Sequence, residues 1–175
     1  MDPLDRFEMT LRKKAPRRIY LAVGQCVVNF GYIESGIDLC IAFIHEDYGG
    51  KNIALELPKT AFSRKLEYFK KAIKNLPNIP FPNEANKMVV LCEQVSKQRN
   101  AILHSQIEIF PQKDLDVHLL RKFEIGLSLV TAEISLKKLF ELNKLIVALA
   151  LQIGNYLDCL KSGLVRPNKH DNPVG

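Results

Sequence analysis

Residues 17–44 read "RRIYLAVGQCVVNFGYIESGIDLCIAFI", and this stretch decides the fold. Apolar side chains recur in it at alternating steps of four and three residues: Ile19, Val23, Cys26, Phe30, Ile33, Ile37, Cys40 and Ile44. That spacing is typical of the buried seam of a long α-helix that packs against other helices. We therefore predict a helix from Pro16 to about Tyr48, ended by Gly49 and Gly50.

Two glycines inside this helix, Gly24 and Gly31, are seven residues apart and share one face. Each costs about 1 kcal/mol of helix stability relative to alanine. Two explanations are open at this point. Close packing against another helix of the same chain would account for them, and so would a contact between two copies of the chain.

Three further helices follow from capping residues and apolar spacing. The first begins at the N-cap Thr60, the second begins after Asn83 and ends near Ser105, and the third runs from the N-cap Ser135 to about Leu160. Residues 106–132 alternate in polarity or are rich in β-forming side chains. They predict a short hairpin or an irregular flap before the last helix.

The fold class predicted from these elements is all-α. We expect an antiparallel four-helix bundle with a short β-hairpin insertion before the last helix. The length of 175 residues favours one domain. We assign residues 1–15 to a basic flexible arm, 16–160 to the helical domain and 161–175 to a disordered tail.

Composition sets further limits. The formal net charge of +6 mildly favours anionic partners. The four cysteines form no CxxC pair and do not cluster with the histidines, so we expect buried free thiols, no metal site and no cofactor. The polar start of the chain and the lack of an apolar run of about 18 residues predict a cytoplasmic protein without a membrane partner.

The segment "KQRNAILHSQ" (97–106) carries the polar residues of most interest. Arg99 falls on the apolar line of its helix, and burial of an unpaired arginine is very costly. Arg99 therefore needs a carboxylate, a cleft or a partner surface. Asn100 and His104 are four residues apart and are neighbours on a helix. About 140° separates Arg99 from His104, so the helix is distorted, the arginine curls back, or two copies share the site.

These side chains suit one chemistry. An imidazole moves protons near neutral pH, and a guanidinium grips a phosphate with two donors. A carboxamide can orient either group. Together they could support attack of a ribose 2′-hydroxyl on its own 3′-phosphate, which needs no metal and is possible on RNA but not on DNA.

The segment "RNAILH" resembles the Arg-Asn-x-x-x-His motif of the HEPN superfamily, the small helical domains of RNA-cutting toxins and defence proteins. The stretches at 31–44 and 60–77 are similar to the helices that precede this motif. The resemblance implies metal-independent endoribonuclease activity in a toxin or antiphage effector. It also implies a homodimer through the motif-bearing helices, with Arg99 holding the scissile phosphate, Asn100 orienting, and His104 as general base or acid.

Two rival functions come with the resemblance. Some HEPN proteins have lost activity, so the chain could be a helical adaptor that binds a nucleotide, an RNA or a protein. A separate antitoxin protein could also control the chain.

Supporting residues have two interpretations each. Glu34 lies at seven-residue spacing between Val27 and Ile41, so we expect it to be semi-buried, paired either with Arg99 or with a surface lysine. Five cations of the second helix form either a solvated face or a strip that contacts RNA phosphates: Arg64, Lys65, Lys70, Lys71 and Lys74.

Overall fold

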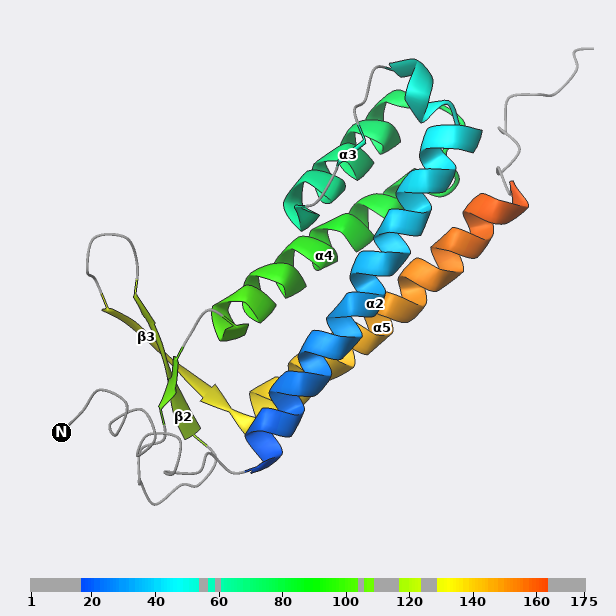
Figure 1. The fold of residues 1–175 in the computed structure, drawn as a ribbon. Helices are drawn as coiled ribbons and strands as arrows, with labels where there is room; N and C mark the ends of the chain where they lie inside the picture. The colour runs from blue at the N-terminus through cyan, green and yellow to red at the C-terminus, as the bar shows by residue number, and fades with distance from the viewer. Residues whose placement is uncertain are drawn as a thin grey trace, which may run out of the picture. The chain divides into compact units, whose positions relative to one another are not determined.

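The computed structural model describes residues 17–53, 57–58, 61–103, 106–108, 117–123 and 129–163. The predicted arm (1–15) and most of the predicted tail lie outside these ranges. The described helices are α2 (Arg17–Asp47), α3 (Phe62–Asn75), α4 (Pro82–Leu103) and α5 (Leu136–Ser162), with a short 3₁₀ helix at Gly50–Ile53 (Figure 1). The predominantly helical character predicted from the sequence is confirmed.

A small sheet precedes α5. It contains β1 (Gln106–Glu108), β2 (Val117–Phe123) and β3 (Leu129–Ser135) in the order β1-β2-β3. Both pairings are antiparallel, with Gln106 opposite Arg121 and Val117 opposite Ser135. The predicted hairpin is therefore present as β2 and β3, and β1 adds a third strand.

The chain packs as two compact units, each described here by itself. Unit 1 comprises Met1–Asn29 and Val95–Ile146, and unit 2 comprises Phe30–Gln94 and Val147–Gly175. The helices α2, α4 and α5 contribute to both units. The sheet belongs to unit 1, and α3 belongs to unit 2.

The predicted apolar stripes form the core of each unit. Unit 1 buries Ile19, Cys26, Val95, Ile102, Leu139 and Ile146. Unit 2 buries the larger set of Phe30, Ile33, Ile37, Cys40, Ile44, Leu66, Phe69, Ile73, Met88, Cys92, Leu149, Ile153, Tyr156 and Leu160. The periodicity of the sequence therefore identified the buried faces of the helices.

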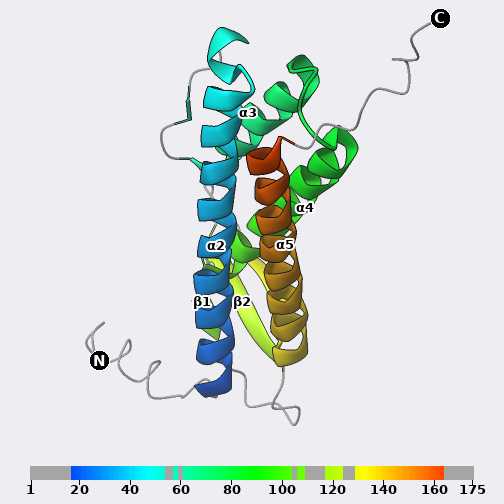
Figure 2. The same cartoon turned by 90° about the vertical axis from the view of Figure 1, so that its right-hand side faces the viewer.

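The expected antiparallel order is wrong for α2 and α5, which run in the same direction in each unit (Figure 2). In unit 1, the Cys26 thiol donates to the Leu139 carbonyl and Asn29 Nδ2 donates to Asn143 Oδ1 at 2.8 Å. A later residue of α2 thus meets a later residue of α5.

The same order holds in unit 2. Gly36 lies against Ile153, and the Tyr48 hydroxyl donates to the Leu160 carbonyl at 2.7 Å. Helix α3 is also parallel to α2, because Lys65 pairs with Asp38 and Tyr68 meets His45. The sequence argument assumed short connections, which force neighbouring helices to reverse, but fourteen residues separate α2 from α3.

Helix ends follow local signals in part. The Ser135 hydroxyl accepts from the Lys138 amide at 3.2 Å, which confirms Ser135 as the cap of α5. Helix α4 begins at Pro82, one of the residues that tolerates the first helical position. Thr60 is not the N-cap of α3, since Ala61 occupies that position and makes no side-chain cap bond.

Gly36 is required by close packing inside unit 2. A Cβ at Gly36 would lie 2.6 Å from Ile153 Cγ2, whereas a Cβ at Gly154 on α5 would meet no described atom within 4 Å. Isoleucine is stiff at χ1, so its methyl group cannot move away freely.

We predict that Gly36→Ala lowers the free energy of unfolding, because an overpacking cost of about 1–3 kcal/mol outweighs a gain in helix propensity of about 1 kcal/mol. The matched variant Gly154→Ala gains the propensity term alone and becomes slightly more stable. Urea denaturation of the two variants and the parent measures both changes. Equal effects of the two substitutions would contradict the packing seen at Gly36.

The four cysteines are free thiols, and Cys26, Cys40 and Cys92 are buried. Burial raises the pKa of Cys40 and of Cys92 to about 12 and also raises the pKa of Cys26. Only the thiolate is nucleophilic, so these three thiols are unreactive in the folded chain.

We predict that a thiol-specific disulfide reagent at pH 8 modifies one thiol per folded chain, that of the partly exposed Cys159. The other three react only in denaturant. The Cys159→Ser variant removes the fast reaction and serves as the control. A fast reaction that persists in this variant would show that one of the buried sites opens.

Helix α2 is long and apolar enough, from Arg18 to Asp47, to cross a membrane by length and composition. A third of the relevant window is buried in the protein. Core helices of soluble proteins and signal sequences share this property. The sequence argument counted only uninterrupted apolar runs and therefore did not identify this helix.

Candidate functional site

The last turns of α4 place Arg99 at the edge of the unit 1 core. Val95 and Ile102, one turn to either side of it, are buried. Arg99 lies on the same line but is only half-buried, so the helix carries a cation where its stripe calls for an apolar side chain. The expectation that this arginine meets a cleft or partner surface is therefore directed at this end of α4.

A shallow recess surrounds the stem of Arg99. Its other lining residues are apolar: Val23, Cys26 and Val27 from α2, and Ile102 and Leu103 from α4. Arg99 Nε is buried at this position. The methylenes of the arginine therefore pack against apolar surface while the terminal nitrogens can reach outward, which is the usual behaviour of a long cationic side chain.

Asn100 holds the guanidinium of Arg99. Arg99 Nη1 donates to Asn100 Oδ1 at 3.0 Å, and the Asn100 side chain is exposed. The planar guanidinium presents its donors in a fixed fork, so one bond to a neighbour restricts the direction of the others. The structure thus brings Arg99 and Asn100 together, and gives Asn100 a positioning contact that sequence spacing alone did not supply.

Two predicted site residues stay predictions. His104 lies outside the described residues, so the distance between Arg99 and His104 is not part of the geometry. Glu34 is half-buried on α2, as expected, but it belongs to unit 2 while Arg99 belongs to unit 1. The pairing of Glu34 with Arg99 or with a lysine is therefore still open.

The predicted cationic strip on α3 is partly neutralised. Lys65 pairs with Asp38 at 2.7 Å and is only 14% exposed, and Lys70 pairs with Glu93 at 2.7 Å. The remaining three members are exposed: Arg64, Lys71 and Lys74. A strip with two of its five charges engaged by carboxylates is a weaker surface for RNA phosphates than the sequence indicated.

Positive charge instead gathers in the helical segments of unit 1. These segments (17–29, 95–103 and 136–146) carry seven cations and one carboxylate: Arg17, Arg18, Lys97, Arg99, Lys137, Lys138, Lys144 and Glu141. The corresponding segments of unit 2 (30–47, 62–75, 82–94 and 147–162) carry seven cations and eight carboxylates. Sequence reasoning missed this asymmetry, because it appears only when the chain is divided by packing.

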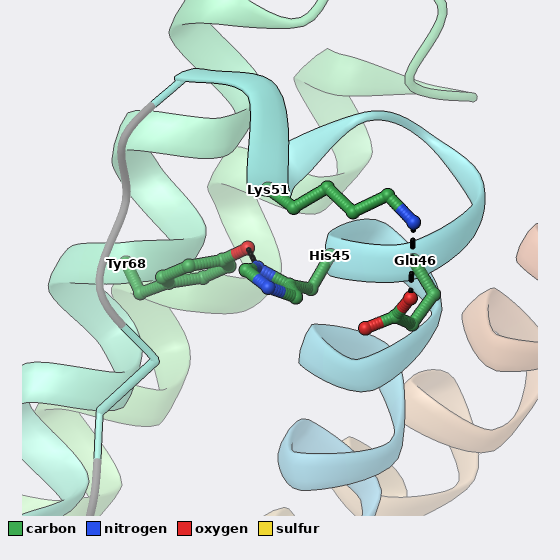
Figure 3. A network of polar contacts seen from close by, with 4 residues as sticks. All are labelled: His45, Glu46, Lys51 and Tyr68. Carbon is green, nitrogen blue, oxygen red and sulfur yellow. Dashed lines mark hydrogen bonds and ion pairs between the residues drawn. The ribbon is translucent and has the colours of Figure 1, made fainter.

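The described part of the chain contains no group of three or more His, Cys, Asp or Glu side chains arranged to hold a metal ion. Unit 2 does contain a polar cluster at the end of α2, which sequence reasoning did not assign (Figure 3). His45 Nδ1 and the Tyr68 hydroxyl are 2.9 Å apart, and Lys51 pairs with Glu46 at 3.3 Å. Burial raises the pKa of Tyr68, so its phenol stays protonated at neutral pH.

This cluster is a structural anchor rather than a reactive site. A Cβ at Gly50 would clash with the Tyr68 hydroxyl and would lie 2.8 Å from His45 Cα. The close approach of the 3₁₀ helix therefore requires glycine and leaves no room beside the pair for a ligand.

We predict that Tyr68→Phe lowers the free energy of unfolding by about 1 kcal/mol, the usual net contribution of one hydrogen bond. The control is Tyr32→Phe, which removes the hydroxyl of an exposed tyrosine and should change stability by less than about 0.5 kcal/mol. Thermal and urea denaturation compare the two. Equal stabilities would mean that His45 and Tyr68 do not bond in solution.

Comparison of the chain with family models, with curated proteins and with solved structures gives no match in any of the three.

Proposed function

We propose that this chain is a metal-independent endoribonuclease of HEPN type, acting in the cytoplasm as a toxin or antiphage effector. One observation carries the proposal. Arg99 is half-buried in an apolar recess at the end of α4, and Asn100 holds its guanidinium. A cation fixed at the rim of an apolar recess is suited to binding a phosphate, because electrostatic attraction is stronger where water is excluded.

The charge of unit 1 supports a polyanionic substrate. Its helical segments carry seven cations against one carboxylate, and Arg99 is one of the seven. Such an excess attracts nucleic acid from a distance and makes binding sensitive to salt. The balanced charge of the unit 2 helices gives no comparable attraction.

The proposed reaction uses groups of this chain and of the RNA. A general base removes the proton of a ribose 2′-hydroxyl, and the oxygen attacks the adjacent 3′-phosphate. The bond from phosphorus to the 5′-oxygen breaks, and a general acid protonates that oxygen. The products are a 2′,3′-cyclic phosphate and a 5′-hydroxyl. Arg99 stabilises the charge on the phosphate oxygens, and His104 acts as base or acid.

Two copies of the chain complete the site in this proposal, since one motif helix cannot direct Arg99 and His104 to the same point without distortion. A second copy supplies the missing angle, with a motif from each chain at one cleft. A separate antitoxin protein could cover the same cleft.

The prediction is cleavage of RNA in the presence of EDTA, assayed with a labelled oligonucleotide. Arg99→Ala and His104→Ala should each reduce the rate by about 10²–10⁴-fold, the usual effect of removing one such group. Asn100→Ala should reduce it less, because it only loosens the arginine. Product ends are read by their resistance to phosphatase until the cyclic phosphate is opened.

The matched control is Lys87→Ala, which removes an exposed cation from the same helix and should leave the rate unchanged. A DNA oligonucleotide of the same sequence should not be cut. Cleavage that requires a divalent metal, or that survives loss of both Arg99 and His104, would overturn the mechanism. Binding of RNA without cleavage would favour the helical adaptor instead.

A further inference from the structure

The outer face of α2 is apolar, exposed and without charge over fifteen residues. No Asp, Glu, Lys or Arg occurs in residues 19–33. The exposed fraction is 56% for Leu21, 63% for Val28 and 66% for Tyr32. All three lie on one side of a single uninterrupted helix. Exposed apolar surface of this extent marks a site of interaction.

Gly24 and Gly31 lie on the same face, and neither serves packing within the described chain. A Cβ at either position would meet no described atom within 4 Å. The first of the two explanations drawn from the sequence, close packing inside one chain, is therefore not supported. Each glycine still costs about 1 kcal/mol of helix propensity. Close approach by an external backbone is the remaining reason for them.

The face is complementary to itself when two helices pack in opposite directions. If Gly24 is level with Val28 of a second copy, then Leu21 is level with Gly31 of that copy, because both helices rise equally per residue. Each large side chain thus lies level with a glycine, which leaves it room, and the twofold symmetry repeats every contact.

The distribution of charge on α2 fits the same register. Arg18 and Glu34 are the charged residues that border the uncharged stretch at its two ends. The register places Arg18 of one copy level with Glu34 of the other, so the two uncharged stretches overlap over their full length. Charges of opposite sign then lie level at both ends of the contact, and no charge of one copy is buried against the apolar face of the other.

We propose that the outer face of α2, formed by Leu21, Gly24, Val28, Gly31 and Tyr32, pairs with the same face of a second copy of this chain in antiparallel orientation. The proposal rests on the proposed function in one respect, since it identifies the second copy that completes the Arg99 site. It assigns the contact to α2 rather than to the motif-bearing helix α4.

This placement brings the partner close to the candidate site. Val23 and Val27 line the recess at Arg99, and each is followed on α2 by a residue of the pairing face, Gly24 and Val28. A second copy on this face therefore adjoins the recess. An RNA cannot be the occupant of the face itself, because the face offers no cation to a phosphate.

The test is sedimentation velocity of the full chain and its variants over a range of concentrations. The parent should be dimeric, and Val28→Glu should raise the dissociation constant by at least about tenfold, because a charge would be buried at the contact. The matched control is Leu151→Glu on α5, whose side chain is equally exposed at 66% and should leave the dimer intact. Circular dichroism checks that both variants are folded.

A further variant separates the dimer from the fold. Gly24→Leu should make the chain more resistant to heat, because the position is open and leucine favours helix. It should nevertheless weaken the dimer, because the added side chain keeps the second backbone away. A Gly24→Leu dimer as tight as that of the parent would contradict the pairing face.

Disulfide crosslinking tests the antiparallel register in a Cys159→Ser background. Gly24→Cys and Val28→Cys should each fail to form a crosslinked dimer alone, because four residues of helix, about 6 Å, separate each cysteine from its own copy. An equimolar mixture of the two variants should crosslink under mild oxidation and give a dimer band on a non-reducing gel. A crosslink in either variant alone, with none gained on mixing, would refute the antiparallel register.

Several results would overturn the proposal as a whole: a monomeric parent at all concentrations, a dimer broken by Leu151→Glu but not by Val28→Glu, or a monomer that floats with phospholipid vesicles through this face. RNA cleavage is measured on the same samples. An inactive dimer that Val28→Glu dissociates would refute the proposed function alone. An active protein whose dimer survives Val28→Glu would refute the pairing face alone.

Discussion

The burial of one apolar stripe on α2 is the constraint on which both units depend. Steps of three and four residues keep this stripe on one side of a helix of 31 residues. The stripe of α5 has the same period, and its members are buried in both units. Removing these side chains from water is the main favourable term in folding, so the two helices must lie side by side wherever their stripes run.

Parallel contacts then set the finer geometry. Asn29 bonds to Asn143 in unit 1, and Gly36 admits Ile153 in unit 2. A polar pair and a glycine at a helix contact allow only a narrow range of registers, since a shifted amide would lose its partner and a shifted isoleucine would meet a side chain. The direction of α2 and α5 is thus secured by a few specific contacts placed within a general apolar seam.

The same residue type has opposite roles on the two sides of α2. Gly36 is packed against Ile153, while Gly24 and Gly31 have no described atom within reach of a Cβ. Glycine lowers helix stability in either place, and only its surroundings tell which contact compensates. A similar point applies to cations. Lys65 is engaged by Asp38, but Arg99 is held by a neutral amide, which leaves its charge available to an anion.

The sequence by itself determined the helices, their buried faces, the cap at Ser135 and the Arg99–Asn100 motif, because periodicity, capping and spacing are local properties of the chain. It failed at Thr60, where no side-chain cap forms, and at the order of the helices. Only the tertiary structure decided that α2, α3 and α5 are parallel, that Asp38 and Glu93 neutralise part of α3, and that positive charge collects with Arg99 in unit 1. Each of these depends on contacts between residues distant in sequence, and no local pattern contains the information about which distant residues will meet.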